Sequence, residues 1–174
     1  MIFAVVGPSG AGKDTLLSGA LAARPDLHLV RRVITRPSEA GGEDFEGVTE
    51  AEFQTRLAKD AFALTWDAHG LRYGIPRDQI TGLNDVVFNG SRAALLQAVS
   101  VFPNLRVILV TAPDAVLAAR LAARGRETVC DIAARLSRAA FTLPHGIAAT
   151  TVVNDATPAE GIARLLAALQ PVSA

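Results

Sequence analysis

The chain begins with a short apolar segment, Ile2 to Val6, followed at once by GPSGAGK at residues 7–13 and then by a helical pattern over 13–23. The spacing from Gly7 to Lys13 matches a phosphate-binding loop, and a strand before it and a helix after it are the context that this motif requires. Its glycines let the backbone turn N–H groups inward around phosphate oxygens, and the helix adds the positive end of its dipole. An ordinary glycine-rich turn is the alternative.

Two residues at the start of this helix bear on the chemistry. Lys13 supplies a mobile cation for a transferring phosphoryl group. Asp14 stands where serine or threonine is usual, and we expect it to bind magnesium, directly or through water; the alternative is that it only caps the positive helix end. The predicted nucleotide contacts in this segment are Gly7, Ser9, Gly10, Ala11, Gly12, Lys13, Asp14 and Thr15.

Strand-like and helix-like segments alternate along most of the chain. Near-continuous apolar runs such as VILV at 107–110 suit a parallel sheet that is buried on both faces, and the alternation implies right-handed crossover connections. Strands are predicted at 2–6, 28–34, 85–89, 105–111 and 149–153, and helices at 13–23, 91–101, 114–124, 130–141 and 158–169. The fold class is therefore α/β.

The segment 35–82 breaks this alternation. It holds a capping-box pattern, Thr49 to Glu52, before a predicted helix at 50–59, and then FALTWDAHGLRYG, which favours two short strands separated by His69-Gly70. We expect a small lobe inserted into a core formed by 1–34 and 83–174. The whole chain, 1–174, is predicted to be a single domain.

Arginines gather around the charged stretch RGRET, residues 124–128. A short lid at about 124–130 is predicted there, with Gly125 as hinge, because closure over the phosphates would exclude water from the transfer. Lys13, Arg124 and Arg135 are the predicted catalytic residues. Arg120, one helical turn before Arg124, is expected to be a bystander.

A second arginine group ends the predicted strand at 28–34. Arg32 and Arg36 share one face of a regular strand, about 13 Å apart. They could hold two anionic groups of one ligand, or adjacent groups if the strand bends at Pro37. Ordinary surface arginines on an edge strand are the alternative.

Composition narrows the partners. Formal net charge is zero over 174 residues, which argues against a general nucleic-acid binder. No apolar run reaches the roughly 20 residues that span a bilayer, and the first apolar segment is too short for a signal peptide. Cys130 is the only cysteine, so no internal disulfide can form. We expect a soluble cytoplasmic protein, either a monomer or a homodimer.

Taken together, these segments resemble the guanylate-kinase-like branch of the P-loop kinases, nearly from end to end. GPSGAGK resembles the phosphate loop, ITRP with GGEDFEGVTEAEF and LRYG the acceptor lobe, RLAARGRET the lid, and TVVND the strand end near the nucleotide base. The resemblance implies a nucleoside-monophosphate-kinase-like parallel sheet flanked by helices, with an inserted acceptor lobe and a short lid. It also places Asn154 and Asp155 at the nucleotide.

The departures from guanylate kinases concern the base. Thr65 stands where a glutamate reads guanine, Arg32 where a serine touches the base, and Asn89 where an aspartate is usual. The second acceptor arginine is absent, with Glu39 nearby. These changes imply an acceptor that is richer in phosphate and lacks guanine.

Within that branch, GPSGAGKD, VITRP, ALTWDAHGLRYG and VFNGSRA resemble the ribose 1,5-bisphosphate phosphokinases. The resemblance implies an ATP- and Mg²⁺-dependent transfer that forms 5-phosphoribosyl 1-diphosphate during phosphonate breakdown. Expected partners are a small sugar phosphate and ATP, with neither nucleic acid nor membrane. The candidates for substrate binding are Arg32, Arg36, Tyr73, Asn89, Ser91 and Arg92.

A phosphate acceptor is already ionised at neutral pH, so alignment and charge neutralisation can carry the reaction without a strong general base. His69 is accordingly expected to be a turn residue or a hydrogen-bonding residue rather than a base. Two other functions stay open: a guanylate-kinase-like nucleoside monophosphate kinase, and a non-catalytic interaction module.

Overall fold

The computed structural model describes residues 1–40, 43–82, 85–123 and 142–170. Contacts divide the chain into two compact units, one made of Met1–Ala4 and Pro25–Arg106, the other of Val5–Arg24 and Val107–Ala174. The predicted lid at 124–130 and the predicted helix at 130–141, which includes Cys130, lie outside the described residues. Within those residues no helix is long and apolar enough to cross a membrane.

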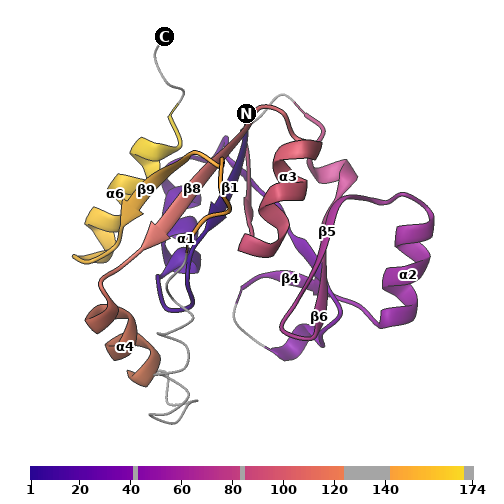
Figure 1. The fold of residues 1–174 in the computed structure, drawn as a ribbon, viewed down its shortest axis with the longest axis horizontal. Coiled ribbons are helices and arrows are strands. Elements are labelled where there is room, and N and C mark those ends of the chain that lie inside the picture. Colours follow the sequence, from indigo (N-terminus) through magenta and orange to yellow (C-terminus); the bar gives the residue numbers. More distant parts are fainter. Residues whose placement is uncertain (41–42, 83–84, 124–141, 171–174) are drawn as a thin grey trace. The chain divides into compact units, whose positions relative to one another are not determined.

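The larger sheet has five strands in the order β2-β7-β1-β8-β9. Its pairings β2 with β7 and β8 with β9 are parallel, and Val107, Ile108 and Val110 of β8 are buried, as the apolar run predicts. β1 takes part in both units, because the division falls between Ala4 and Val5. The strands, labelled in Figure 1 where there is room, are β1 (Ile2–Val6), β2 (His28–Leu29), β7 (Val86–Asn89), β8 (Leu105–Thr111) and β9 (Ala149–Val153).

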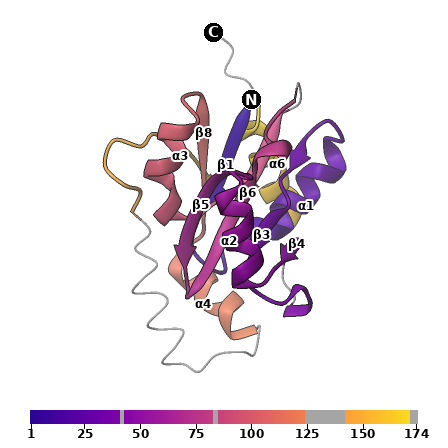
Figure 2. The same cartoon turned by 90° about the vertical axis from the view of Figure 1, so that its right-hand side faces the viewer.

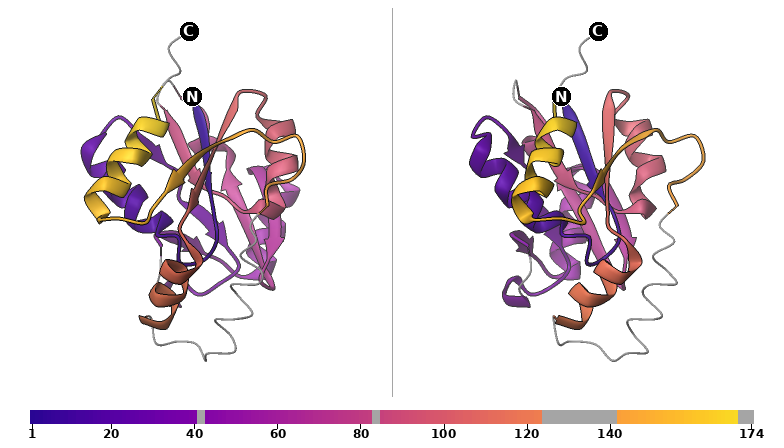
Figure 3. Two further views of the ribbon diagram at one scale, coloured as in Figure 1. Left: turned by 60° about the vertical axis from the view of Figure 1, so that its left-hand side comes forward. Right: turned by 90° about the vertical axis from the view of Figure 1, so that its left-hand side faces the viewer.

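Among the described residues, the helices of the second unit are α1 (Lys13–Ala23), α4 (Asp114–Ala123) and α6 (Pro158–Ala168). Figure 3 shows α6 alongside α1, and the two helices are in contact. Gly19 permits this approach, because a Cβ there would lie 2.2 Å from Ile162 Cδ1. A capping box formed by Thr157 and Glu160 fixes the start of α6.

A smaller sheet in the first unit has the order β4-β3-β6-β5. Its strands are β3 (Arg32–Ile34), β4 (Phe45–Gly47), β5 (Phe62–Ala68) and β6 (Leu71–Pro76). Helix α2 (Glu50–Ala58), with the predicted capping box at Thr49, lies beside it in Figure 2. Phe53 of α2 stacks on Phe62 with ring centroids 4.7 Å apart, and the two rings form one hydrophobic cluster with the buried Val33.

Two predicted elements differ in the structure. The apolar run 28–34, predicted as one strand, forms β2 in the larger sheet and β3 in the smaller one. The N–H of Val30 still bonds to Val87 O, whereas that of Arg31 bonds to the Gln79 side chain. An apolar run cannot indicate where a chain changes sheets. The helix predicted at 91–101 is a short 3-10 turn, η3 (Arg92–Ala94), followed by α3 (Leu95–Val101).

Candidate active site

The phosphate-binding segment follows β1 and leads into α1, as its spacing predicts. Gly7 must lack a side chain, because a Cβ there would lie 2.0 Å from Val110 O. Gly12 adopts a left-handed conformation with φ of 87° and caps α1. A Cβ on Gly12 would lie 2.5 Å from Asn154 Nδ2. These close approaches fix the path of the loop where its main-chain N–H groups precede a helix N-terminus.

Lys13 folds back over the loop. Its ammonium group donates hydrogen bonds to Gly7 O at 2.9 Å and Pro8 O at 3.1 Å. The cation is therefore held against the segment whose N–H groups are suited to phosphate oxygens. Asp14 and Thr15 are exposed in the first turn of α1, so both predicted nucleotide contacts are accessible.

Asn154 braces the loop from the end of β9. Its side chain is buried, and Nδ2 donates to Ala11 O at 2.8 Å. Its neighbour Asp155 pairs with Arg164 at 2.8 Å. The hydrogen bond from Arg164 lowers the pKa of the Asp155 carboxyl. Both predicted nucleotide contacts thus have partners within the protein, and their part in nucleotide binding stays a prediction.

Sequence reasoning overlooked Arg120. Expected to be a bystander, it lies at the loop in the structure: its Nη1 is 3.9 Å from where a Gly12 Cβ would be. That nitrogen is buried and has no hydrogen-bond partner among the described residues. The sequence signal that could have identified Arg120 was its spacing of four residues before Arg124, which predicts a shared helix face. Arg124 and Arg135 themselves lie outside the described residues.

The first unit gathers several of the predicted substrate-binding residues. Arg32, at the start of β3, is only 7% exposed. It donates from Nη1 to Asn89 O at 2.7 Å, and its Nη2 pairs with Glu43. Asn89, at the end of β7, donates from Nδ2 to the other Glu43 oxygen at 3.4 Å. Glu43 was not among the predicted residues, although GGE lies in the acceptor-lobe motif.

Aromatic rings flank this cluster. Trp66 and Tyr73, opposite each other on β5 and β6, stack with ring centroids 5.2 Å apart and planes within 5° of parallel. The Arg32 guanidinium lies 5.8 Å and 5.3 Å from the two centroids. Burial raises the pKa of the Tyr73 phenol, against the opposing effect of Arg32 and Arg36. The phenol is therefore neutral at physiological pH and can donate a hydrogen bond.

Arg36 does not continue β3. Its N–H bonds to Ile34 O at 2.8 Å, so the chain bends just before Pro37, and the guanidinium lies 4.2 Å from the centroid of Phe45. Two further predicted contacts follow β7. Ser91 caps η3 by accepting from the N–H of Ala93 at 3.3 Å, and Arg92 begins η3 with an exposed side chain.

His69 is a turn residue, with φ of 54° between β5 and β6. Nearby Asp67 pairs with Arg72 at 3.6 Å.

Across the described residues no three His, Cys, Asp or Glu side chains come together as a metal site. Magnesium beside nucleotide phosphates is usually held by one or two carboxylates together with those phosphates. An exposed Asp14 beside the loop fits that role.

Comparisons with known proteins agree with this geometry. No family model matches the chain. It is 58% identical over 149 residues to the ribose 1,5-bisphosphate phosphokinase PhnN of Ruegeria sp. (strain TM1040). The matched segment covers 84% of this chain and 78% of that protein. It is 48% identical over 178 residues to the protein of the same name from Pseudomonas fluorescens (strain SBW25), covering 95% and 92% of the two chains.

Among solved structures, a guanylate kinase from Anaplasma phagocytophilum matches with a TM-score of 0.69, covering 97% of this chain and 84% of that one at 17% identity. That similarity shows the guanylate-kinase-like α/β fold predicted from the sequence. The relatives at 58% and 48% identity show more than the fold. The chain belongs to the ribose 1,5-bisphosphate phosphokinase family.

Proposed function

We propose that this protein transfers the γ-phosphoryl group of ATP to the 1-phosphate of ribose 1,5-bisphosphate, forming 5-phosphoribosyl 1-diphosphate and ADP. An oxygen of the acceptor phosphate forms a bond to the γ-phosphorus as the bond from that phosphorus to the β–γ bridging oxygen breaks. The acceptor oxygen is already ionised, so no side chain has to remove a proton. The reaction belongs to phosphonate breakdown.

The observation that carries this proposal is the contact between Arg32 and Asn89. Arg32 stands where guanylate kinases have a serine that touches the base, and Asn89 stands where an aspartate is usual. In this chain one is a buried cation bonded to the main chain of the other, so the two positions form a charged cluster of their own. A carboxylate is also missing from the guanine-reading position, where β5 carries Thr65.

The donor side of the reaction rests on the phosphate loop. Its N–H groups and the start of α1 hold the phosphates of ATP, and Lys13 neutralises charge that develops during transfer. Asp14 would hold magnesium beside the loop, and the ion would supply positive charge that neutralises the phosphates of ATP. Arg124 and Arg135 are proposed to complete the charge neutralisation, and Arg36 and Arg92 to bind phosphates of the acceptor.

An assay of the purified protein tests this function. With ATP and magnesium, ribose 1,5-bisphosphate should give ADP and 5-phosphoribosyl 1-diphosphate, while GMP should react with a kcat/KM at least about tenfold to a hundredfold lower. Lys13→Ala should retain the fold, as judged by circular dichroism, and lose about a hundredfold or more in kcat. Comparable turnover of GMP would overturn the proposal in favour of a nucleotide kinase.

A further inference from the structure

The cluster around Arg32 presents a carboxylate, not a guanidinium, to its surroundings. Both terminal nitrogens of Arg32 are engaged, one by Asn89 O and the other by Glu43. The Arg32 side chain is 8% exposed, whereas that of Glu43 is 21% exposed. The more accessible side chain of this pair is therefore the carboxylate, although the strand carries the arginine.

This arrangement restricts what can bind beside Glu43. A carboxylate repels phosphate oxygens and only accepts hydrogen bonds when ionised. Two adjacent hydroxyl groups can each donate to one of its oxygens. Arg32 and Asn89 each donate to one of the two carboxylate oxygens, so the orientation of the carboxylate is set before a ligand arrives.

We propose that Glu43 is the residue that selects ribose: its carboxylate accepts hydrogen bonds from the vicinal 2- and 3-hydroxyls of the acceptor sugar. Arg32 is then a positioning residue that orients Glu43, and the phosphates of the acceptor bind to other cations. This assignment replaces phosphate binding by Arg32 and rests on the proposed function. It requires the enzyme to discriminate against pentoses that lack either hydroxyl.

The test compares ribose 1,5-bisphosphate with its 2-deoxy and 3-deoxy analogues in the wild type and in Glu43→Gln. The wild type should prefer ribose 1,5-bisphosphate by at least about a hundredfold in kcat/KM over each analogue. Glu43→Gln should lose most of its activity on ribose 1,5-bisphosphate and little on either deoxy analogue, so each preference should fall at least about tenfold. If Glu43 served only in folding, Glu43→Gln would lower kcat/KM for all three substrates by the same factor. That result would overturn the inference.

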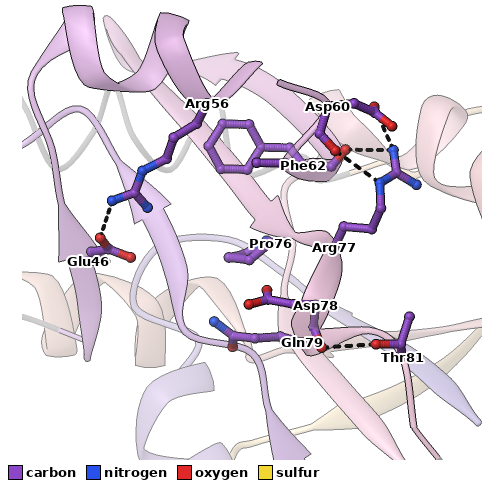
Figure 4. Close-up of a pocket in the computed structure, with 10 residues that line it drawn as sticks. Glu46, Arg56, Asp60, Phe62, Pro76, Arg77, Asp78, Gln79 and Thr81 are labelled. Atoms are coloured by element: carbon purple, nitrogen blue, oxygen red, sulfur yellow. Dashed lines mark hydrogen bonds and ion pairs between the residues drawn. The ribbon is translucent and has the colours of Figure 1, made fainter. Parts of the chain in front are cut away.

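Glu46→Gln is the matched control. Figure 4 shows Glu46 paired with Arg56 at the edge of an open hollow of ≈ 700 Å³ in the same unit. This variant also breaks a glutamate–arginine pair, but no predicted substrate residue lines that hollow. It should leave the ribose preference unchanged. If Glu46→Gln narrows the preference as much as Glu43→Gln does, the inference fails.

Further variants and substrates separate the remaining outcomes. If Glu43→Gln does not fold, Glu43→Asp is the alternative variant, because it keeps the charge on a shorter side chain. It should retain part of the ribose preference. A preference equal to that of the wild type would contradict a role of Glu43 in selecting ribose. Turnover of GMP that depends on Glu43 would instead assign the carboxylate to a guanine edge, which also carries paired donors. Absence of any ribose 1,5-bisphosphate activity in the wild type would overturn the proposed function itself, and this inference with it.

Discussion

Asn154 donates its side-chain N–H to the main-chain oxygen of Ala11 across 2.8 Å, which joins the end of β9 to the phosphate loop. The two residues are 143 positions apart in the sequence, and Asn154 is buried at 5% exposure. A buried hydrogen bond of this kind is costly to break, because the group left behind has no partner. The shape of the loop therefore depends on the last strand of the sheet.

Replacing Asn154 tests whether it braces the loop or reads the base. Asn154→Ala should destabilise the protein by about 1–3 kcal/mol and raise the KM for the nucleotide. A brace acts on the phosphates, so the KM values for ATP and GTP should rise by the same factor. Steady-state kinetics with both nucleotides measure this. A changed preference between ATP and GTP would instead indicate direct contact with the base.

Gly12→Ala should abolish nucleotide binding. The new Cβ would lie 2.5 Å from Asn154 Nδ2 at a position with φ of 87°. Gly146→Ala is the matched control, because Gly146 has a similar φ of 85° with nothing within 4 Å. Both variants carry the left-handed strain of about 1 kcal/mol, but only Gly12→Ala should lose ADP binding by calorimetry. Equal losses in the two variants would contradict a steric role for Gly12.

Asp14→Asn should raise the magnesium concentration that half-saturates activity, since it removes a charged oxygen ligand in the first turn of α1. The helix-capping alternative makes a different prediction. An aspartate that only favours the positive end of α1 contributes about 0.3–1 kcal/mol to stability, and its loss would leave the magnesium requirement unchanged. Magnesium titrations at fixed ATP, together with thermal unfolding, distinguish the two.

The capping box of α6 makes part of the stability depend on pH. The hydrogen bond from the Thr157 hydroxyl, and then that from its N–H, lower the pKa of the Glu160 carboxyl from 4.5. A carboxyl whose pKa is lower in the folded state stabilises that state above its unfolded pKa. This stabilisation is lost as the pH falls through the folded pKa.

Thr157→Ala should therefore raise the pKa of Glu160 towards 4.5, as measured by NMR titration of the side-chain carboxyl. The stability difference between wild type and variant should shrink as the solution is acidified. Glu52, whose pKa is lowered by Thr49 in the capping box of α2, is the internal control. Its pKa should be the same in the wild type and in Thr157→Ala. A constant stability difference across the acid range would contradict this linkage.

The sequence alone determined the features that depend on residues close together in the chain. The phosphate loop could be predicted because its spacing, preceding strand and following helix all lie within the first 23 residues. The capping box at Thr49 and the β5–β6 turn at His69-Gly70 could be predicted for the same reason, because short-range hydrogen bonds and backbone conformations specify them. The resemblance of the sequence motifs to those of known kinases also allowed the family to be predicted.

Only the tertiary structure decided which side chains meet. Arg32 was expected to hold a phosphate, but Asn89 from another strand and Glu43 from the segment after β3 occupy its terminal nitrogens. Arg120 and Asn154 meet the phosphate loop from α4 and β9. Such contacts join residues far apart in sequence, and burial and hydrogen bonding across the packed elements select them. A periodic pattern along one segment carries no information about them.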